Sequence, residues 1–324
     1  MDNLRVMFLS KYADATSDMV FEDLAERNYA NYHIAFRESI QKLFNNLSVT
    51  HCINDIMEKS NDIDFVISLY NRFPVRNSEI FISSLCEYYH IPYLGATPNI
   101  RAIAEDKHIA KGLASALGIP TAQWFIVSKK SQIPFQPPFN APYFIKPRFG
   151  ASSQNIDETC ICDSWNAAKN KIKNLIEDGY DVIIEKFIDG VFYSVPAFAT
   201  DKIIISPPYI LKTNKKGNVI TYKQKRAIES GMIREFCTRD DLTFKLMEYS
   251  KLLYSNLMPL DYARFDFIVE KNTQQIFFLE FNICCNLSPR SGYVQTCIHN
   301  NIVNDYDELI HLIIFNSLKR QNLI

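Results

Sequence analysis

The stretch 262–282 reads YARFDFIVEKNTQQIFFLEFN, and its pattern is the strongest indication of the fold of this chain. Two apolar runs flank a short polar turn, which is the pattern of a β-hairpin. Side chains alternate between the two faces of a strand. Arg264 and Asp266 therefore share one face of the first strand, and Glu280 and Asn282 share one face of the second. If the two strands pair, we expect these four polar side chains to converge.

The same alternation predicts the apolar faces of the hairpin. Ala263, Phe265 and Phe267 should lie together on the first strand. Phe277, Leu279 and Phe281 should lie together on the second. These six side chains are expected to face the core, opposite the polar groups.

The converging polar groups suit a magnesium site. Two carboxylates and an amide from Asp266, Glu280 and Asn282 supply oxygen ligands, which Mg²⁺ takes together with substrate phosphates. Arg264 beside them would stabilise negative charge that develops in a transition state. The alternative is a surface hairpin whose polar face meets water, which explains alternation in general. It explains less well why Arg, Asp, Glu and Asn stand alone on strongly apolar strands.

Apolar runs and helical patterns alternate along the chain, so we predict an α/β protein. We expect strands at 4–9, 64–69 and 91–94, and a long helix at 25–46. A further helix at 106–117 should bury Ile109, Leu113 and Leu117, and should stop at Gly118 and Pro120. At 324 residues the chain is long enough for two or three domains. We place them at 1–97, 98–189 and 190–324.

Composition excludes several classes of protein. Lys and Arg total 35 against 36 for Asp and Glu, so no basic excess indicates a nucleic-acid partner. No run approaches the ~20 apolar residues needed to cross a bilayer, and we expect no membrane partner. The eight cysteines show no zinc-site spacing, and we expect free thiols in a cytoplasmic protein.

The order of the motifs resembles ATP-grasp ligases of the D-alanine–D-alanine ligase type. Arg-Phe-Asp at 264–266 and Phe-Leu-Glu-Phe-Asn at 278–282 resemble the R-x-D and E-x-N signature that holds two magnesium ions in that family. The resemblance also rests on five further stretches: Asp106-Lys107, the strand 144–147 with Lys146, the pair Ser152-Ser153, the hinge segment 183–190, and the loop residues Tyr222 and Lys225.

The resemblance implies a three-domain ATP-grasp fold, with ATP between the central and C-terminal domains. It implies ATP and Mg²⁺, two ions with Mn²⁺ as a substitute, small-molecule carboxylate and amine substrates, and a homodimer. Nucleotide contacts would come from Lys107, Lys146, Ser152, Ser153, Glu185, Lys186, Phe187, Ile188, Tyr222, Lys225 and Phe278. Arg264, Lys225 and Ser153 would be catalytic, and Asp266, Glu280 and Asn282 would bind the metal. Ser291, Gly292, Asn286 and Arg72 would contact substrate.

The chain departs from the family pattern where substrates bind. The Gly-Gly-x-Ser-x-Glu turn after the first strand is absent, and residues 10–14 offer no matching acid. The segment 69–76 has gained Arg72 and Arg76, which would bind a substrate carboxylate or simply face solvent. The phosphate loop has lost glycines at Ala151 and Asn155.

Two further departures concern the ribose contact and the substrate end of the motif. Phe192 stands where an acid usually meets the ribose, and Asn286 replaces a glycine. Cys284 and Cys285 are expected to be buried and inert rather than reactive.

The nucleotide half of the pattern is therefore kept, while both substrate pockets are rewritten. We expect a ligase that forms an amide through an acyl phosphate, from substrates other than two D-alanines. A dipeptide or a specialised metabolite is the expected product. Two alternatives stay open: a ligase that uses a non-amine nucleophile or a non-amino-acid acid, and an ATP-binding regulatory protein without turnover.

Overall fold

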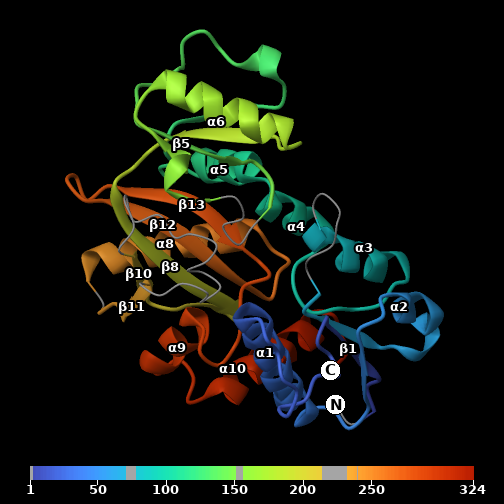
Figure 1. Ribbon diagram of the computed structural model, residues 1–324. Coiled ribbons are helices and arrows are strands. Elements are labelled where there is room, and N and C mark those ends of the chain that lie inside the picture. Colours follow the sequence, from blue (N-terminus) through green and yellow to red (C-terminus); the bar gives the residue numbers. More distant parts are fainter. Residues whose placement is uncertain (1–2, 71–77, 151–155, 214–231, 239) are drawn as a thin grey trace.

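The strands in the described part of the chain form three separate sheets. The computed structural model describes residues 3–70, 78–150, 156–213, 232–238 and 240–324. One sheet falls in each of the three segments predicted from the sequence (Figure 1). The α/β class is confirmed, and the domain boundaries stay a prediction.

The first sheet is parallel and small. Its strands are β1 (Val6–Leu9), β2 (Leu47–Thr50) and β3 (Phe65–Ser68), in the order β2-β1-β3. Its helices are α1 (Leu24–Gln41), α2 (Asn54–Glu58) and α3 (Phe81–Tyr88). β2 was not predicted, and α1 ends five residues before the expected Asn46. The strand expected at 91–94 is only an isolated bridge between Val66 and Tyr93.

The second sheet is antiparallel, in the order β4-β7-β5-β6. Its strands are β4 (Trp124–Val127), β5 (Tyr143–Pro147), β6 (Ile161–Cys162) and β7 (Val182–Lys186), with α6 (Trp165–Glu177) packed on one face. α4 (Pro98–Glu105) and α5 (Lys107–Ala116) precede it in the chain. Short 3₁₀ turns lie at Ser60–Asp62, Ser78–Ile80, Lys130–Gln132 and Glu158–Cys160.

The third sheet is antiparallel and the largest. It runs β11-β10-β8-β12-β13, with β9 paired to β8. Its strands are β8 (Gly190–Ala199), β9 (Ile203–Ile205), β10 (Tyr209–Thr213), β11 (Met232–Phe236), β12 (Tyr262–Glu270) and β13 (Ile276–Asn282). The remaining helices are α8 (Asp241–Asn256), α9 (Gly292–His299) and α10 (Tyr306–Arg320). Asp240 caps α8 by accepting the Thr243 N–H.

The first sheet shares a hydrophobic core with the C-terminal helices. Phe8 and Phe36 from the first unit lie in one buried cluster with Tyr262 of β12 and Ile310 of α10. α1 and α10 lie side by side in Figure 1. The N-terminal unit is therefore fixed against the third sheet rather than tethered to it.

Helix α5 buries a different face from the one predicted. Ile109 is 44% exposed, while Lys107, Ala110, Lys111 and Ala114 are buried. The helix packs on β13 of the third sheet, while Lys111 pairs with Glu185 on β7 of the second sheet and Lys107 donates to the Gly150 carbonyl. Gly118 has a φ of +74° and ends the helix as expected.

The β12–β13 hairpin forms as predicted, but its register shifts once. Asp266 lies opposite Glu280, and Phe267 lies opposite Phe278, so Leu279 is the extra residue of a β-bulge. The bulge breaks the strict alternation on β13. Phe278 and Phe281 face the core, while Leu279 turns with Glu280 toward a cleft. The predicted apolar face of 277, 279 and 281 is therefore wrong.

None of the described helices combines the length and the apolar character needed to cross a membrane.

Candidate active site

A cleft lies between the second and third sheets. β5 and β7 form one wall, and β8, β10, β12 and β13 form the other, with the loop before α9 at one end. Eleven of the residues singled out from the sequence line it: Lys146, Glu185, Lys186, Phe187, Ile188, Arg264, Asp266, Glu280, Asn286, Ser291 and Gly292. The fold thus gathers residues that are spread over about half of the chain.

The carboxylate of Asp266 is the centre of a hydrogen-bond cluster on β12. The Arg264 guanidinium donates to both of its oxygens, at 2.8 and 2.6 Å. Ser194 on β8 donates its hydroxyl at 2.7 Å, and Asn282 on β13 donates its side-chain N–H at 2.9 Å. Burial alone would lower the pKa of Arg264, and the adjacent Asp266 raises it well above its usual value. The arginine therefore stays charged inside the protein.

The donor set on the hairpin fits a hard divalent cation. No group of three or more His, Cys, Asp or Glu side chains is placed to hold a metal among the residues that the structure describes. The predicted set consists of two carboxylates and one amide. Because the Asn282 amide N–H faces Asp266, its oxygen is left to face elsewhere. Two carboxylates and an amide oxygen leave room for phosphate and water ligands, which is how Mg²⁺ is usually bound.

Opposite the hairpin, Glu185 lies between two lysines. Its carboxylate is 2.9 Å from the Lys146 ammonium and 3.2 Å from that of Lys111. All three side chains are nearly inaccessible to solvent. Burial would raise the pKa of Glu185, but the two lysines overcome it and hold this pKa at about 2. An ionised Glu185 therefore fixes the Lys146 ammonium at the cleft wall and the Lys111 ammonium behind it.

Lys111 was missed by the sequence analysis. It lies one helical turn after Lys107, so both lysines project from the same face of α5. The i, i+4 spacing was the available signal, and the apolar residues on the next face of the helix obscured it.

Lys107 lies beside Gly150, just after β5, and is not among the residues that line the cleft. Its ammonium donates to the carbonyl of Gly150. Asp106 caps α5 and forms a bidentate ion pair with Arg148, at 2.8 and 2.6 Å. This pair ties the start of α5 to the end of β5, which keeps Lys107 beside Gly150.

The far part of the cleft is apolar. Phe144 and Phe187 approach with ring centroids 6.3 Å apart, and Ile188, Phe192 and Leu279 complete the lining. Lys186 donates to the carbonyls of Asn140 and Ala141, at 2.9 and 2.7 Å. Flat apolar walls of this kind suit a planar ring such as a purine.

Phe278 does not line the cleft, which corrects its predicted nucleotide contact. Its ring is fully buried and packs edge-on against Phe267, with centroids 5.8 Å apart. Its backbone N–H donates to the Pro120 carbonyl. The bulge puts Leu279 in the cleft-facing position instead. Arg72, Ser152, Ser153, Tyr222 and Lys225 lie outside the described residues.

The loop before α9 closes the other end of the cleft. Ser291 caps α9 through the Val294 N–H, and Asn286 accepts the Ser288 N–H. A Cβ on Gly292 would come within 2.5 Å of the Tyr209 ring, so only glycine fits there. Arg234, which the sequence analysis missed, lines this end and donates to the Arg290 carbonyl at 3.0 Å.

A second cavity adjoins the cleft on the side of the first sheet. Arg264 and Asn286 line both spaces, and Asn282 lines the second. Its other walls come from α1, β3, α3 and the segment after β13. Cys284 faces this cavity, and Cys285 is buried, which raises the pKa of its thiol. All eight cysteines are free thiols.

The fold and the cleft define an ATP-grasp ligase. Among solved structures, the chain is similar to a D-alanine–D-alanine ligase from Bacillus anthracis complexed with ATP, with a TM-score of 0.73 and 20% identity over 99% of each chain. It is also similar to VanG, a D-Ala:D-Ser ligase from Enterococcus faecalis, with a TM-score of 0.66 and 13% identity. The match to VanG covers 97% of this chain and 99% of the VanG chain.

The family follows from the sequence comparison. The D-ala D-ala ligase C-terminus family matches residues 113–315, which is more than half of the chain. The chain is 27% identical to a D-alanine–D-alanine ligase from Clostridium perfringens, over 82% of this chain and 84% of that protein. It is 29% identical to one from Clostridium botulinum, with the same coverage. The chain belongs to the D-alanine–D-alanine ligase family of ATP-dependent carboxylate–amine ligases.

Proposed function

We propose that this protein activates a small carboxylic acid with ATP and joins it to an amine, and that the pair of substrates is not two D-alanines. The acid attacks the terminal phosphorus of ATP to form an acyl phosphate, with ADP as the leaving group. The amine then attacks the acyl carbon, and inorganic phosphate leaves with the formation of the amide. An amino acid is the expected acid, and the amide is a dipeptide or a related metabolite.

One observation carries this proposal. The Asp266–Glu280 pair on the hairpin faces a cleft whose opposite wall presents Lys146, held in place by Glu185. Oxygen ligands on one wall and an ammonium on the other suit a polyphosphate chain between them. The apolar end with Phe187 and Ile188 then receives the adenine.

The residues have distinct roles in the proposed reaction. Asp266, Glu280 and Asn282 hold two magnesium ions, which neutralise the charge of the phosphates; Mn²⁺ can replace them. Lys146 and Lys107 contact phosphate oxygens. Arg264 lies where the cleft meets the second cavity, so its guanidinium stabilises the negative charge that develops as the acid and the amine react. Ser152, Ser153, Tyr222 and Lys225 are assigned to the phosphates from the family pattern alone.

Two departures support substrates other than two D-alanines. The family acid after the first strand is missing, and residues 10–14 read Ser-Lys-Tyr-Ala-Asp. Asn286 replaces a glycine in the loop that lines both spaces, and its side chain is held by the Ser288 N–H. A relative of this fold is itself named a D-Ala:D-Ser ligase, so the fold accommodates altered substrate pockets.

The first test is phosphate release from ATP and Mg²⁺, with pooled D- and L-amino acids as substrates. We expect turnover that needs two amino acids and falls at least 100-fold in Glu280→Gln, because the amide lacks the charge that binds the metal. Glu270→Gln on the same hairpin is the matched control and should keep its activity. D-alanine alone should give little turnover. Efficient D-alanyl-D-alanine formation would contradict the substrate claim, and wild-type activity in Glu280→Gln would contradict the site.

A further inference from the structure

The second cavity is placed to hold the acid that is activated. It has a volume of about 130 Å³ and shares Arg264 and Asn286 with the cleft. A cavity of ~150 Å³ is large enough for benzene, so this one holds a group of roughly six heavy atoms. A molecule there can extend its carboxylate past Arg264 toward the phosphates.

The wall of this cavity contains an arginine without an ion-pair partner. Arg101 on α4 donates to the carbonyls of Ala96, Leu94 and Glu79, at 2.7, 3.3 and 3.3 Å. It also donates to the Cys284 sulfur at 3.1 Å. Throughout the described residues, no carboxylate oxygen is recorded within 4 Å of its guanidinium nitrogens. Carbonyl dipoles satisfy its N–H groups. Burial would lower the pKa of Arg101, and nearby groups that include Glu79 raise it without a direct ion pair between Glu79 and Arg101.

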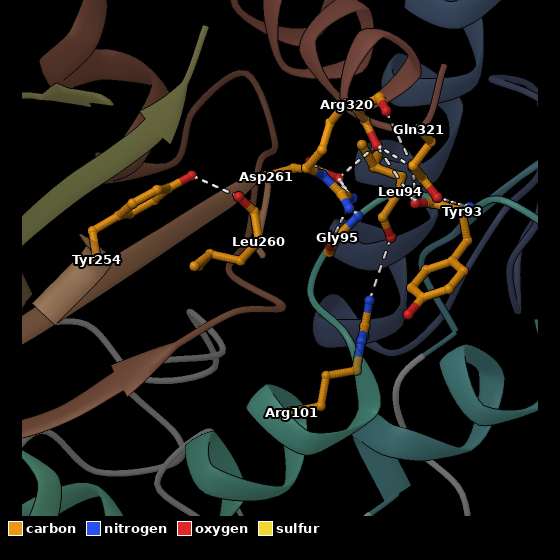
Figure 2. A network of polar contacts seen from close by, with 10 residues as sticks. Tyr93, Leu94, Gly95, Arg101, Tyr254, Leu260, Asp261, Arg320 and Gln321 are labelled. Atoms are coloured by element: carbon orange, nitrogen blue, oxygen red, sulfur yellow. Dashed lines mark hydrogen bonds and ion pairs between the residues drawn. The ribbon is translucent and has the colours of Figure 1, made fainter. Parts of the chain in front are cut away.

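The position of Arg101 is fixed by a buried carboxylate behind it. Asp261 is fully buried and accepts the Gly95 N–H at 2.7 Å (Figure 2). It also accepts Ser317 at 2.6 Å and pairs with Arg320 at 2.9 Å, both on α10. These contacts lock the segment 94–96, whose carbonyls hold Arg101.

Gly95 brings the backbone close to the guanidinium. It has a φ of +114°, and a Cβ there would lie 2.4 Å from a terminal nitrogen of Arg101. Any side chain at this position would displace the arginine. Arg101 is therefore a fixed cation rather than a mobile one.

The described lining offers a single acid to balance a substrate ammonium. Glu79 is its only acid, is 6% exposed, and has contacts of its own. His33 is buried, which lowers its pKa to about 4, so it is neutral near pH 7. The remaining polar lining is largely tyrosine: Tyr29, Tyr32, Tyr70, Tyr93 and Tyr262. Tyrosine hydroxyls can donate hydrogen bonds to an anion, but the Tyr93 hydroxyl already donates to Glu87 at 2.8 Å, so Tyr93 is not counted as a donor to substrate.

We propose that this cavity selects an acid that carries a second anionic group, with Arg101 as the residue that recognises it. This inference rests on the proposed function, because it names the class of the acid in that reaction. Its size and charge fit a four- or five-carbon dicarboxylic acid, such as aspartate or succinate. The reacting carboxylate points to Arg264, and the second carboxylate lies against Arg101 and the tyrosines.

The first experiment compares acids with amides of the same shape on the wild-type protein. Calorimetry with ADP and Mg²⁺ present measures the binding of two acid–amide pairs. These are aspartate and asparagine, each as both enantiomers, and succinate and succinamate. We expect each acid to bind at least tenfold more tightly than its amide. Equal binding of acid and amide, tighter binding of the amide, or no binding of either at 10 mM would overturn the inference.

The second experiment uses variants of Arg101. Arg101→Gln should abolish the preference for the acid while leaving amide binding within about threefold, and Arg101→Lys should keep part of it. Arg5→Gln, at a surface ion pair far from the cavity, is the matched control. Retained acid preference in a folded Arg101→Gln would contradict the assignment.

Phosphate release with the same pairs separates the two proposals. Binding of acids that depends on Arg101, without turnover with any amine, would leave the cavity assignment standing and remove the ligase claim. Turnover only with acids that carry no second anionic group would support the ligase claim and remove the cavity assignment.

Discussion

Asp266 and Glu280 lie directly opposite each other on β12 and β13, and the register shifts at the next pair. The two carboxylates therefore stand side by side at the one place where the hairpin stops alternating. The bulge lets Leu279 and Glu280 both face the cleft, while Phe278 stays in the core. Bulges often redirect side chains next to active sites.

This geometry predicts that two neighbouring substitutions affect different properties, one mainly the stability of the fold and the other mainly the binding of ATP. Phe278→Ala should lower the free energy of unfolding by about 3–5 kcal/mol, because it leaves a cavity among Phe267 and its neighbours. Leu279→Ala should cost only about 1 kcal/mol of stability, because its side chain is half-buried. It should raise the Kd for ATP by about fivefold through lost contact with the base.

Urea unfolding and ATP titration measure both quantities. If Phe278→Ala remained stable but lost ATP binding, the original sequence prediction would hold and the bulge assignment would fail.

Most of the fold could be predicted because it depends on local signals. The alternation in 262–270 predicted β12, and Gly118 marked the end of α5 because its positive φ suits glycine. β2, with the sequence Leu-Ser-Val-Thr, was too short and too polar to stand out before its pairing with β1 was known.

The candidate site was predictable only where a motif carried it. The face of α5 that is buried depends on Glu185, more than 70 residues away, which makes lysines more favourable inside than Ile109. The bulge at Leu279 depends on how two strands fit together, and nothing in the strand sequence required it. Arg101 lay in a helix that was not predicted at all. Long-range electrostatics and register, rather than local preference, account for these misses.

The buried charges at Glu185 should be strongly coupled. Glu185→Gln leaves Lys111 and Lys146 close together without an anion between them, and it should cost at least ~3 kcal/mol of stability. Lys111→Met should cost about 2–4 kcal/mol by the same reasoning. The double variant should cost less than the sum by about 1–3 kcal/mol, because it leaves one buried ammonium, that of Lys146, without an anion instead of two.

Urea unfolding of the two single variants and the double variant gives the coupling free energy. Lys245→Met, which breaks an exposed ion pair on α8, should change stability by less than ~0.5 kcal/mol. Additive costs for Lys111 and Glu185 would show that the ion pair does not hold the wall of the cleft.

The Asp261 cluster should control the order of the segment 94–96. Asp261→Asn removes the ion pair with Arg320 and should lower stability by about 3 kcal/mol. Ser317→Ala removes one hydrogen bond and should cost about 1 kcal/mol.

Hydrogen exchange adds a local measurement to this comparison. The Gly95 amide should exchange much faster in Asp261→Asn than in Ser317→Ala, since its acceptor is weakened only in the first. Equal exchange in both variants would mean that Asp261 does not hold this segment.

His33 should make the stability of the protein depend on pH. Burial lowers its pKa from 6.5 to about 4, and its Nδ1 accepts the Tyr12 N–H. A depressed pKa means that the unfolded chain takes up the proton first as the pH falls. The stabilisation is therefore complete above pH 6.5 and is lost as the pH falls from about 6.5 toward 4. At pH 5 the loss should be about 2 kcal/mol.

His33→Asn keeps a hydrogen-bond acceptor near the same place but does not titrate. Urea unfolding at pH 7 and pH 5 should show a smaller drop in stability for His33→Asn than for the wild type, by about those 2 kcal/mol. An equal drop in both proteins would mean that His33 is already protonated in the fold, and the neutral wall of the second cavity would then be lost.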